Sequence, residues 1–265
     1  MTKTQRRAAP RPRTAHAIAI CSALALAAAG CGSDDDEAAN ASPSTANTGS
    51  DLPQGSDHVE IDPAEFTTEI DNPYWPMTPG SRWVYEEVED GEELRVEVTV
   101  TEKTKVVDGV ETRVVRDVVS DENGEPVEVT DDWYAQDSDG NIWYFGEDTA
   151  EYKNGEPVNQ HGSFEAGVDG AEAGVILPAD PKPGLSYREE YYAGEAEDAA
   201  TVLSTSEQAE VPAGHYTDAL MTSNVNPLEP KVQEYKLYAE GVGPVLVLLT
   251  SGAVGTEQLV SFESG

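Results

Sequence analysis

One stretch decides the fold class: Leu94–Thr101 (LRVEVTVT), in which apolar and polar side chains alternate without exception. Successive side chains of a β-strand point to opposite faces of a sheet, so a period of two predicts a strand with one buried and one solvated face. The β-branched valines also favour a strand over a helix. We therefore expect an antiparallel sheet around this segment.

Turn dipeptides divide the chain on both sides of this stretch at nearly even spacing. Asp-Gly and Asn-Gly pairs are typical of tight hairpins, because these residues adopt the positive φ that such turns require. A series of them predicts long strands joined in sequence order. The pairs are Asp90-Gly91, Asp108-Gly109, Asn123-Gly124, Asp139-Gly140 and Asn154-Gly155.

The remaining segments support an all-β fold class, a long antiparallel meander of about eleven strands. No amphipathic helix of useful length is predicted. Because an open sheet of this length is unusual, twist should curl it into a barrel or half-barrel. The other predicted strands are Ser81–Glu89, Val110–Val119, Val127–Tyr134, Asn141–Phe145, Leu185–Tyr192, Ala199–Ser204, Tyr216–Asn224, Gln233–Ala239, Pro244–Thr250 and Gln258–Phe262.

The N-terminus predicts an export signal. Residues 1–15 are basic without acids, Ala17–Ala29 is nearly all apolar, and the run closes on Ala28-Ala29-Gly30-Cys31. This apolar run is too short for a membrane-spanning helix, which takes about 20 residues. Small residues directly before a cysteine resemble the cleavage site of bacterial lipoproteins, whose new N-terminal cysteine carries diacylglycerol. We expect lipidation of Cys31; the alternative is an ordinary secretory signal with an incidental cysteine.

These features divide the chain into three parts. Residues 1–30 are predicted to be the lipoprotein signal peptide, and residues 31–57 the lipidated cysteine with a flexible acidic tether, rich in Gly, Ser, Asp and Ala. Residues 58–265 are predicted to form a single β domain. Since Cys21 lies inside the signal, no disulfide is expected in the mature chain. The protein should be exported and lipid-anchored to the cell membrane, facing outside the cytoplasm.

The charge balance excludes one class of partner. The chain has 16 Lys and Arg against 51 Asp and Glu, a formal net charge of -35. Such a surface repels phosphate backbones, so nucleic acid is not an expected partner. The expected partners are the membrane, through the anchor, and an apolar ligand or a surface protein. High acidity is also typical of proteins that stay hydrated in concentrated salt.

Several stretches together resemble a family of exported bacterial lipoproteins to which no activity is assigned. The resemblance covers roughly residues 66 to 262, and its aromatic and glycine pattern is fairly specific. In fold class and location alone, the chain also resembles the half-barrels of lipoprotein carriers, a likeness that assigns no residues. The stretches are Asn72-Pro73-Tyr74-Trp75-Pro76 with Pro79-Gly80 and Trp83, Asp132–Asp137 with Asp139-Gly140-Asn141, and Tyr235–Ala239 with Gly241-Val242-Gly243.

A binding site for a lipid-like or other apolar ligand is the leading functional hypothesis. The segment His161–Gly184 is rich in Gly, Ala and Pro, and so long a connection usually covers something, so we interpret it as a candidate lid. Aromatic and aliphatic side chains there and in the Pro-rich segment Asp71–Gly80 are expected to border an apolar space. The alternative is a structural or protein-interaction module with a filled core and no small-molecule ligand. The candidate ligand-binding residues are Tyr74, Trp75, Trp83, Phe164, Ile176 and Leu177.

A weak metal candidate lies at the fourth turn dipeptide. Asp137, Asp139 and Asn141 alternate as at the start of a calcium loop, but such a loop needs glycine at its sixth position, and Gly140 is fourth. A type I′ turn explains the same residues. Apart from weakly bound calcium, no cofactor is expected.

The sequence lacks the catalytic motifs that would indicate an enzyme. No Gly-x-Ser-x-Gly elbow or phosphate-binding glycine loop is present, and His58, His161 and His215 are too far apart in sequence for a local metal site. We expect a protein without catalytic residues.

The anchor yields a direct prediction. Because the thiol of Cys31 is the lipid acceptor, Cys31→Ser should abolish labelling by a palmitate analogue and release the protein from membranes or leave it unprocessed. Labelling and membrane sedimentation of the two proteins measure this. A labelled, sedimenting variant would show that the lipoprotein hypothesis is wrong.

Overall fold

The alternating stretch forms the first half of β3 (Glu92–Val107), whose inward side chains are buried from Leu94 to Val100. The computed structural model describes residues 52–89, 91–251 and 254–265, and every structural statement concerns these residues. In that part of the chain the one helical element is the 3₁₀ turn η1 (Pro63–Glu65), capped by the carboxylate of Asp62. No helix described there is long and apolar enough to cross a membrane.

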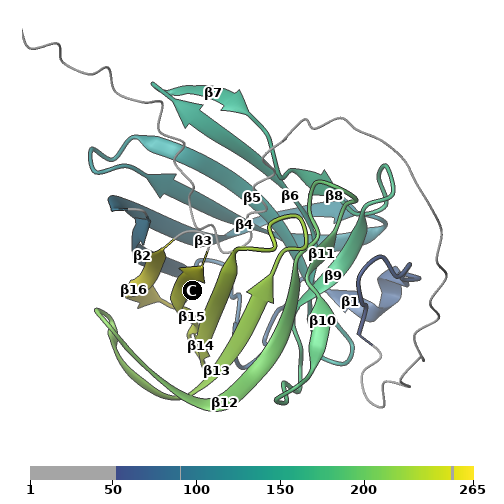
Figure 1. Ribbon diagram of the computed structural model, residues 1–265. Helices are drawn as coiled ribbons and strands as arrows, with labels where there is room; N and C mark the ends of the chain where they lie inside the picture. Colours follow the sequence, from purple (N-terminus) through teal and green to yellow (C-terminus); the bar gives the residue numbers. More distant parts are fainter. Residues whose placement is uncertain (1–51, 90, 252–253) are drawn as a thin grey trace, which may run out of the picture.

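The described strands form one antiparallel sheet that curls into a nearly closed barrel, which confirms the predicted fold class (Figure 1). The hydrogen-bonded path runs β10-β12-β13-β14-β15-β16-β2-β3-β4-β5-β6-β9-β11, while β1 pairs with β5 and β7 and β8 pair with β6. The other strands are β1 (Phe66–Thr67), β2 (Arg82–Glu89), β4 (Val110–Ser120), β5 (Pro126–Asp137), β6 (Ile142–Lys153), β7 (Glu156–Asn159), β8 (Phe164–Glu165), β9 (Glu172–Leu177), β10 (Ser186–Arg188), β11 (Glu190–Tyr191), β12 (Ala199–Val211), β13 (Gly214–Val225), β14 (Gln233–Ala239), β15 (Gly243–Ser251) and β16 (Gly255–Glu263).

Four predicted hairpin dipeptides and Gly91 of the fifth lie at turns between paired strands. Asp90 is outside the described residues. At Asp108-Gly109 and Asn154-Gly155 both residues have positive φ, as a type I′ turn requires. At Asp139-Gly140 only Gly140 does, with φ 93°. The type I′ prediction is wrong there, because the loop has one more residue and needs only its last residue in the left-handed region.

The candidate lid contributes strands to the sheet. Within residues 161–184, β8 and β9 both pair with β6, so the expectation of an irregular cover is wrong. The short apolar run that ends in Ile176 and Leu177 is a buried strand, with both side chains in the main core. Its length and flanking prolines concealed it, since a strand this short has no visible alternation.

One extended segment joins the two ends of the sheet. β10 pairs with β12 and β11 pairs with β9, and only Glu189 separates them in the chain. Gly174 in β9 lets the seam close, because a Cβ there would lie 2.3 Å from the carbonyl oxygen of Glu189. The guanidinium of Arg188 links β10 to β9 across the seam, because its Nη2 donates a hydrogen bond to the carbonyl oxygen of Ala173 at 2.6 Å.

Aromatic side chains fill one end of the barrel. Trp75 is 2% exposed, and its ring centroid lies 5.7 Å from that of Tyr134 and 6.2 Å from that of Tyr238. The indole nitrogen of Trp83 donates to the carbonyl oxygen of Val242 at 2.8 Å. The Pro-rich segment therefore plugs this end with its tryptophan.

The sequence stretches that carry the family resemblance meet at this plug. The Asn72 amide donates to the carbonyl oxygens of Gly140 at 3.0 Å and Pro178 at 3.3 Å. The Gln136 side chain accepts from the backbone N–H groups of Asp71 and Asn72, each at 3.0 Å. Buried backbone groups need such partners, so these polar side chains hold an irregular segment inside the barrel end.

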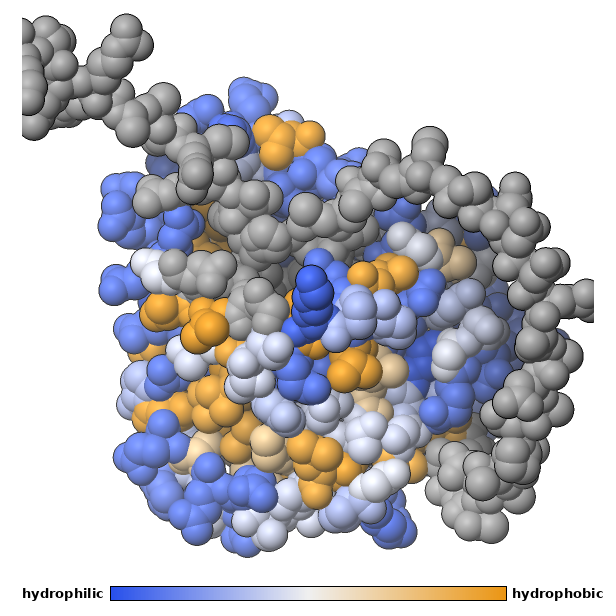
Figure 2. Space-filling view, in the orientation of Figure 1, coloured by the Kyte–Doolittle hydropathy of each residue, from blue (hydrophilic) through white to orange (hydrophobic). Residues whose placement is uncertain are grey.

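On the face shown in Figure 2, apolar side chains gather among hydrophilic ones in the region of β12 to β15. Two of the exposed apolar residues, Leu203 and Val225, belong to β12 and β13. Apolar residues scattered over a surface are ordinary in folded proteins.

Closure at the seam yields a prediction. Gly174→Ala should lower the free energy of unfolding by about 2 to 3 kcal/mol, because the new Cβ forces β9 away from the backbone of Glu189. Gly170→Ala is the control, since it meets nothing within 4 Å and adds only the cost of its positive φ, about 1 kcal/mol. Urea denaturation measures both, and equal losses would contradict the seam as described.

Candidate functional site

A layer of buried acidic side chains follows the aromatic end of the barrel. The strand register places Glu87 opposite Glu257, and Asp132 opposite Glu147, on the inward face. This layer separates Val247 and Leu249 from the main apolar core. The buried ionisable residues are Glu87, Arg113, Asp117, Glu128, Asp132, Glu147, Arg188, Glu189, Glu190, Lys236 and Glu257.

Two of these carboxyl groups share one hydroxyl. The Tyr144 oxygen lies 2.9 Å from Asp132 Oδ1 and 2.7 Å from Glu147 Oε2. A hydroxyl has one proton to donate, so the second short contact needs a proton on one of the carboxyl groups. Burial raises the pKa of Asp132 to about 7, and burial with the neighbouring Asp132 charge raises the pKa of Glu147 well above its ordinary value. The pair therefore holds a proton at neutral pH.

A second acidic group lies at the barrel seam. Burial raises the pKa of Asp198 to about 7, and it raises the pKa of Glu190 well above its ordinary value, with the Asp198 charge as the next cause. The Glu189 carboxylate accepts from the Asn224 amide at 2.9 and 2.8 Å. Burial raises the pKa of Glu189 as well, against the opposing charge of Lys236.

Some of the buried acids lack hydrogen-bond partners among the described residues. Both carboxylate oxygens of Glu257 are buried without one, and so is Oδ1 of Asp117. Burial is the main cause that raises the pKa of each well above its ordinary value. Burying an ionised carboxylate without partners is very costly, so burial favours the neutral form of both groups.

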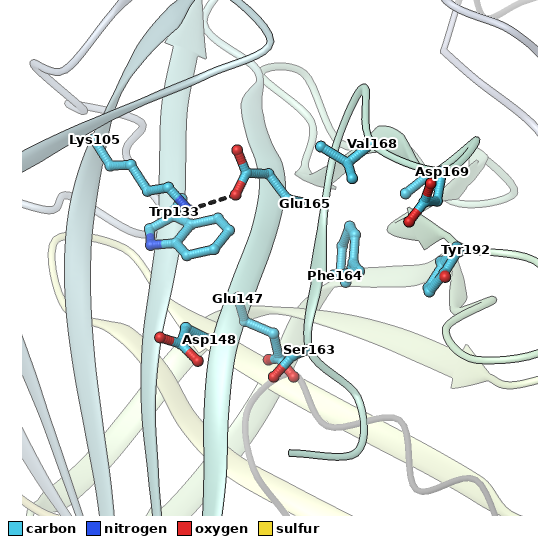
Figure 3. Close-up of a pocket in the computed structure, with 11 residues that line it drawn as sticks. Lys105, Trp133, Glu147, Asp148, Ser163, Phe164, Glu165, Val168, Asp169 and Tyr192 are labelled. Carbon is cyan, nitrogen blue, oxygen red and sulfur yellow. Dashed lines mark hydrogen bonds and ion pairs between the residues drawn. The ribbon is translucent and has the colours of Figure 1, made fainter.

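A pocket of about 340 Å³ opens beside this layer, between β5, β6 and the segment 163–171 (Figure 3). Glu147 belongs both to the pocket wall and to the shared-hydroxyl pair. The close-up shows Lys105 and Trp133 on one side of the space and Asp169 and Tyr192 on the other. The lining residues are Lys105, Trp133, Glu147, Asp148, Ser163, Phe164, Glu165, Val168, Asp169, Ala171 and Tyr192.

Strand alternation directs Trp133 to this pocket, because its side chain points to the face opposite to that of Asp132 and Tyr134. The β5–β6 register shifts beside it, where β6 has one more residue than β5 between the pairs Asp132–Glu147 and Tyr134–Tyr144. The Lys105 ammonium lies 3.1 Å from the centre of the Trp133 ring and 2.7 Å from Glu165 Oε2. The pocket thus combines an aromatic face, a carboxylate and a cation from the chain itself.

The predicted ligand-binding residues do not form one site. Phe164 lines the pocket, whereas Trp75, Trp83, Ile176 and Leu177 are buried in the main core outside its wall. Tyr74 is half-buried against the same core. Binding of an apolar ligand by this set stays a prediction.

The calcium candidates form a turn. Asp137 Oδ1 accepts from the backbone N–H groups of Asp139 and Asn141 at 3.0 and 2.8 Å, while Oδ2 accepts from the Trp143 indole at 2.7 Å. The Asn141 amide oxygen accepts from the backbone of Ala179 at 2.9 Å. Across 52–89, 91–251 and 254–265, no group of three or more His, Cys, Asp or Glu residues is arranged to hold a metal ion.

Other predicted positions lie apart from the pocket. Cys31 is outside the described residues, so its lipidation stays a prediction. His58 contacts Glu172 at 2.8 Å and His215 contacts Glu210 at 2.9 Å, both on the surface. No catalytic arrangement is built on them.

Sequence analysis missed the acidic layer and the pocket. A signal for the layer was present, because Glu87 has the same parity as Trp83 and Tyr85, and Asp117 the same parity as Val115 and Val119. An acid in register with an apolar face points to a buried carboxyl group. The pocket depends on a bulge and on the pairing of β8, which leave no comparable sequence pattern.

Two solved structures are similar to this chain. One is a proposed lipoprotein from Parabacteroides distasonis ATCC 8503, 12% identical, with a TM-score of 0.39, covering 72% of this chain and 98% of that one. The other is a proposed exported protein with a YmcC-like fold from Bacteroides fragilis NCTC 9343, 14% identical, with a TM-score of 0.40, covering 72% and 99%. No protein-family model and no curated protein matches the chain significantly. Function is therefore argued from the residues of this chain.

The buried acids yield a pH prediction. A carboxyl group whose pKa is higher in the folded than in the unfolded state stabilises the fold at low pH, and this contribution is lost as pH rises from the unfolded pKa through the folded one. Because the pKa of Asp132 and of Asp198 rises from 3.8 to about 7 on folding, the free energy of unfolding should fall between about pH 4 and pH 7. Urea denaturation measures the fall in about 0.5 M sodium chloride, which screens surface repulsion.

The control for this prediction is the double variant Asp132→Asn, Glu147→Gln, which keeps polar groups beside Tyr144 and removes two titrating carboxyls. Its free energy of unfolding should fall less steeply with pH than that of the wild type. Parallel profiles would show that this pair does not hold the proton.

Proposed function

We propose that the chain is an exported, membrane-anchored binding module that holds a small ligand in the pocket between β5, β6 and residues 163–171. The observation that carries this proposal is the pocket itself, because about 340 Å³ lies in the range of small-molecule sites and polar groups converge on it from four segments. Glu147 adds a wall carboxyl with a raised pKa, a feature that clusters at functional sites.

The membrane anchor is proposed from two sequence features. One is the signal-like segment that closes at Cys31, and the other is the acidic tether predicted for residues 31–57. A chain of that composition spans roughly 30 Å, which would let the barrel stand clear of the headgroups. The ligand would then be taken up outside the cytoplasm.

The pocket lining supports a polar ligand more than the lipid-like ligand expected from the sequence. Glu147, Asp148, Glu165 and Asp169 contribute carboxyl groups, and the aromatic rings cover only part of the wall. A fatty-acid carboxylate would face like charges there. A lipid-like ligand remains one outcome of the test, and a module without a small-molecule ligand is the other.

Blocking the pocket tests the proposal. Val168 lines the pocket and is 49% exposed, so Val168→Trp should fill the space without disturbing the core. The matched control is Val158→Trp, because Val158 is 54% exposed and lies outside the pocket wall. Ligand-observed NMR on full-length protein carrying Cys31→Ser, with amines, sugars and fatty acids as probes, should find compounds whose binding weakens at least roughly tenfold in Val168→Trp only, a loss of about 1.4 kcal/mol.

The contrary result is equally clear. If no probe binds, or if the two tryptophan variants affect every probe alike, the pocket is not a ligand site. The interaction-module alternative would then be the better account of the fold.

A further inference from the structure

We propose that the ligand of this pocket carries an ammonium group, which takes the place of the Lys105 ammonium on the face of Trp133. This inference rests on the proposed function and names the chemical class that the same pocket recognises. Three observations support it. The Lys105 ammonium already lies on the Trp133 ring, acidic residues outnumber cationic residues in the pocket wall, and the Lys105 side chain is partly exposed.

The first observation is the geometry around Lys105. Its ammonium is 3.1 Å from the centre of the Trp133 ring and 2.7 Å from Glu165 Oε2. Tryptophan gives the strongest attraction of a cation to an aromatic face, and a carboxylate at its edge adds a charge-assisted hydrogen bond. The pocket therefore contains an ammonium position with one aromatic face and one carboxylate acceptor.

The second observation is the charge of the wall. Three acidic residues, Asp148, Glu165 and Asp169, line the pocket together with one cationic residue, Lys105, while Glu147 belongs to the pair that holds a proton. The Gln160 amide donates to Asp148 at 3.2 Å, which leaves that charge in place. A second cation would lower the repulsion among these acids, whereas an anion would raise it.

The third observation is the exposure of the present occupant. The Lys105 side chain is 34% exposed and its Glu165 partner 38%, and ion pairs this exposed contribute little to stability. Lysine has a flexible stem that can swing to solvent and remain hydrated. Trp133, by contrast, is buried and lies in a strand that pairs regularly with β4, so the aromatic face stays when the lysine leaves.

Other ligand classes fit these observations less well. The described residues hold no group of three acids placed for a metal ion. A neutral sugar could stack on Trp133 but would gain nothing from the acids and would have to break the Lys105 contact. An organic cation would replace the contact of the Lys105 ammonium with the Trp133 ring by another contact between a cation and the same ring.

The test compares n-butylammonium with 1-butanol, its neutral counterpart, on full-length protein carrying Cys31→Ser. Binding is measured by ligand-observed NMR titration at low ionic strength, because salt weakens charge interactions. We expect the ammonium to bind at least roughly tenfold more tightly than the alcohol, and Val168→Trp to remove the difference.

Three variants locate the contact. Lys105→Ala should bind n-butylammonium roughly tenfold more tightly than the wild type, because the ligand no longer competes with a tethered ammonium on the same ring. Trp133→Leu and Glu165→Gln should each weaken binding several-fold in the Lys105→Ala background. Near-ultraviolet circular dichroism of each variant checks the fold, and the partly exposed Lys105 and Glu165 variants give the result if Trp133→Leu fails to fold.

The outcomes separate this inference from the function on which it rests. If sugars or fatty acids bind in a manner sensitive to Val168→Trp while butylammonium and butanol bind alike, the ammonium proposal is wrong and the binding module stands. Unchanged or weaker butylammonium binding by Lys105→Ala would likewise overturn displacement of the lysine. If no probe binds at all, both proposals are wrong.

Discussion

Closure of the sheet through one continuous segment is the constraint on which the other features depend. Because β10 and β11 are separated only by Glu189, the chain pairs with both ends of the path at once. Many inward side chains then lose contact with water, acidic ones included. A close approach at Gly174 makes this possible, and the acids that share the inward register become buried groups with raised pKa values as a result.

The pocket is a local exception to this closed wall. Trp133 has no register partner in β6, and β6 pairs nearby with the two-residue strand β8. The pocket of about 340 Å³ lies at this place in the sheet. Glu147 connects this space to the interior, since the residue lines the pocket and its carboxyl group contacts Tyr144. Events in the pocket and protonation of the Asp132–Glu147 pair are therefore physically linked, because a charge placed near one carboxyl changes the pKa of both.

Local patterns in the sequence predicted the architecture, and long-range pairing determined the site. Alternation in Leu94–Thr101 and the hairpin dipeptides predict a meander that curls, because both are properties of neighbouring residues. The strand Glu172–Leu177 was missed since it is short and lacks alternation, and its pairing with β6 spans a long loop. Phe164 was the one predicted ligand-binding residue that lines the pocket. Lys105 and Trp133 meet only after β3 and β5 are brought together, and no local pattern joins them.

The shared proton at Tyr144 bears on how the charge of this protein is counted. The formal net charge of -35 treats every carboxyl group as ionised. In the folded barrel, burial raises the pKa values of the Asp132–Glu147 and Glu190–Asp198 pairs, so these pairs hold protons at a pH where the unfolded chain has lost them. Folding is therefore accompanied by proton uptake from the surrounding solution. A chain that crosses a membrane unfolded and folds on the far side would draw those protons from that side, and the finished protein would migrate in an electric field as a less acidic molecule than its composition states.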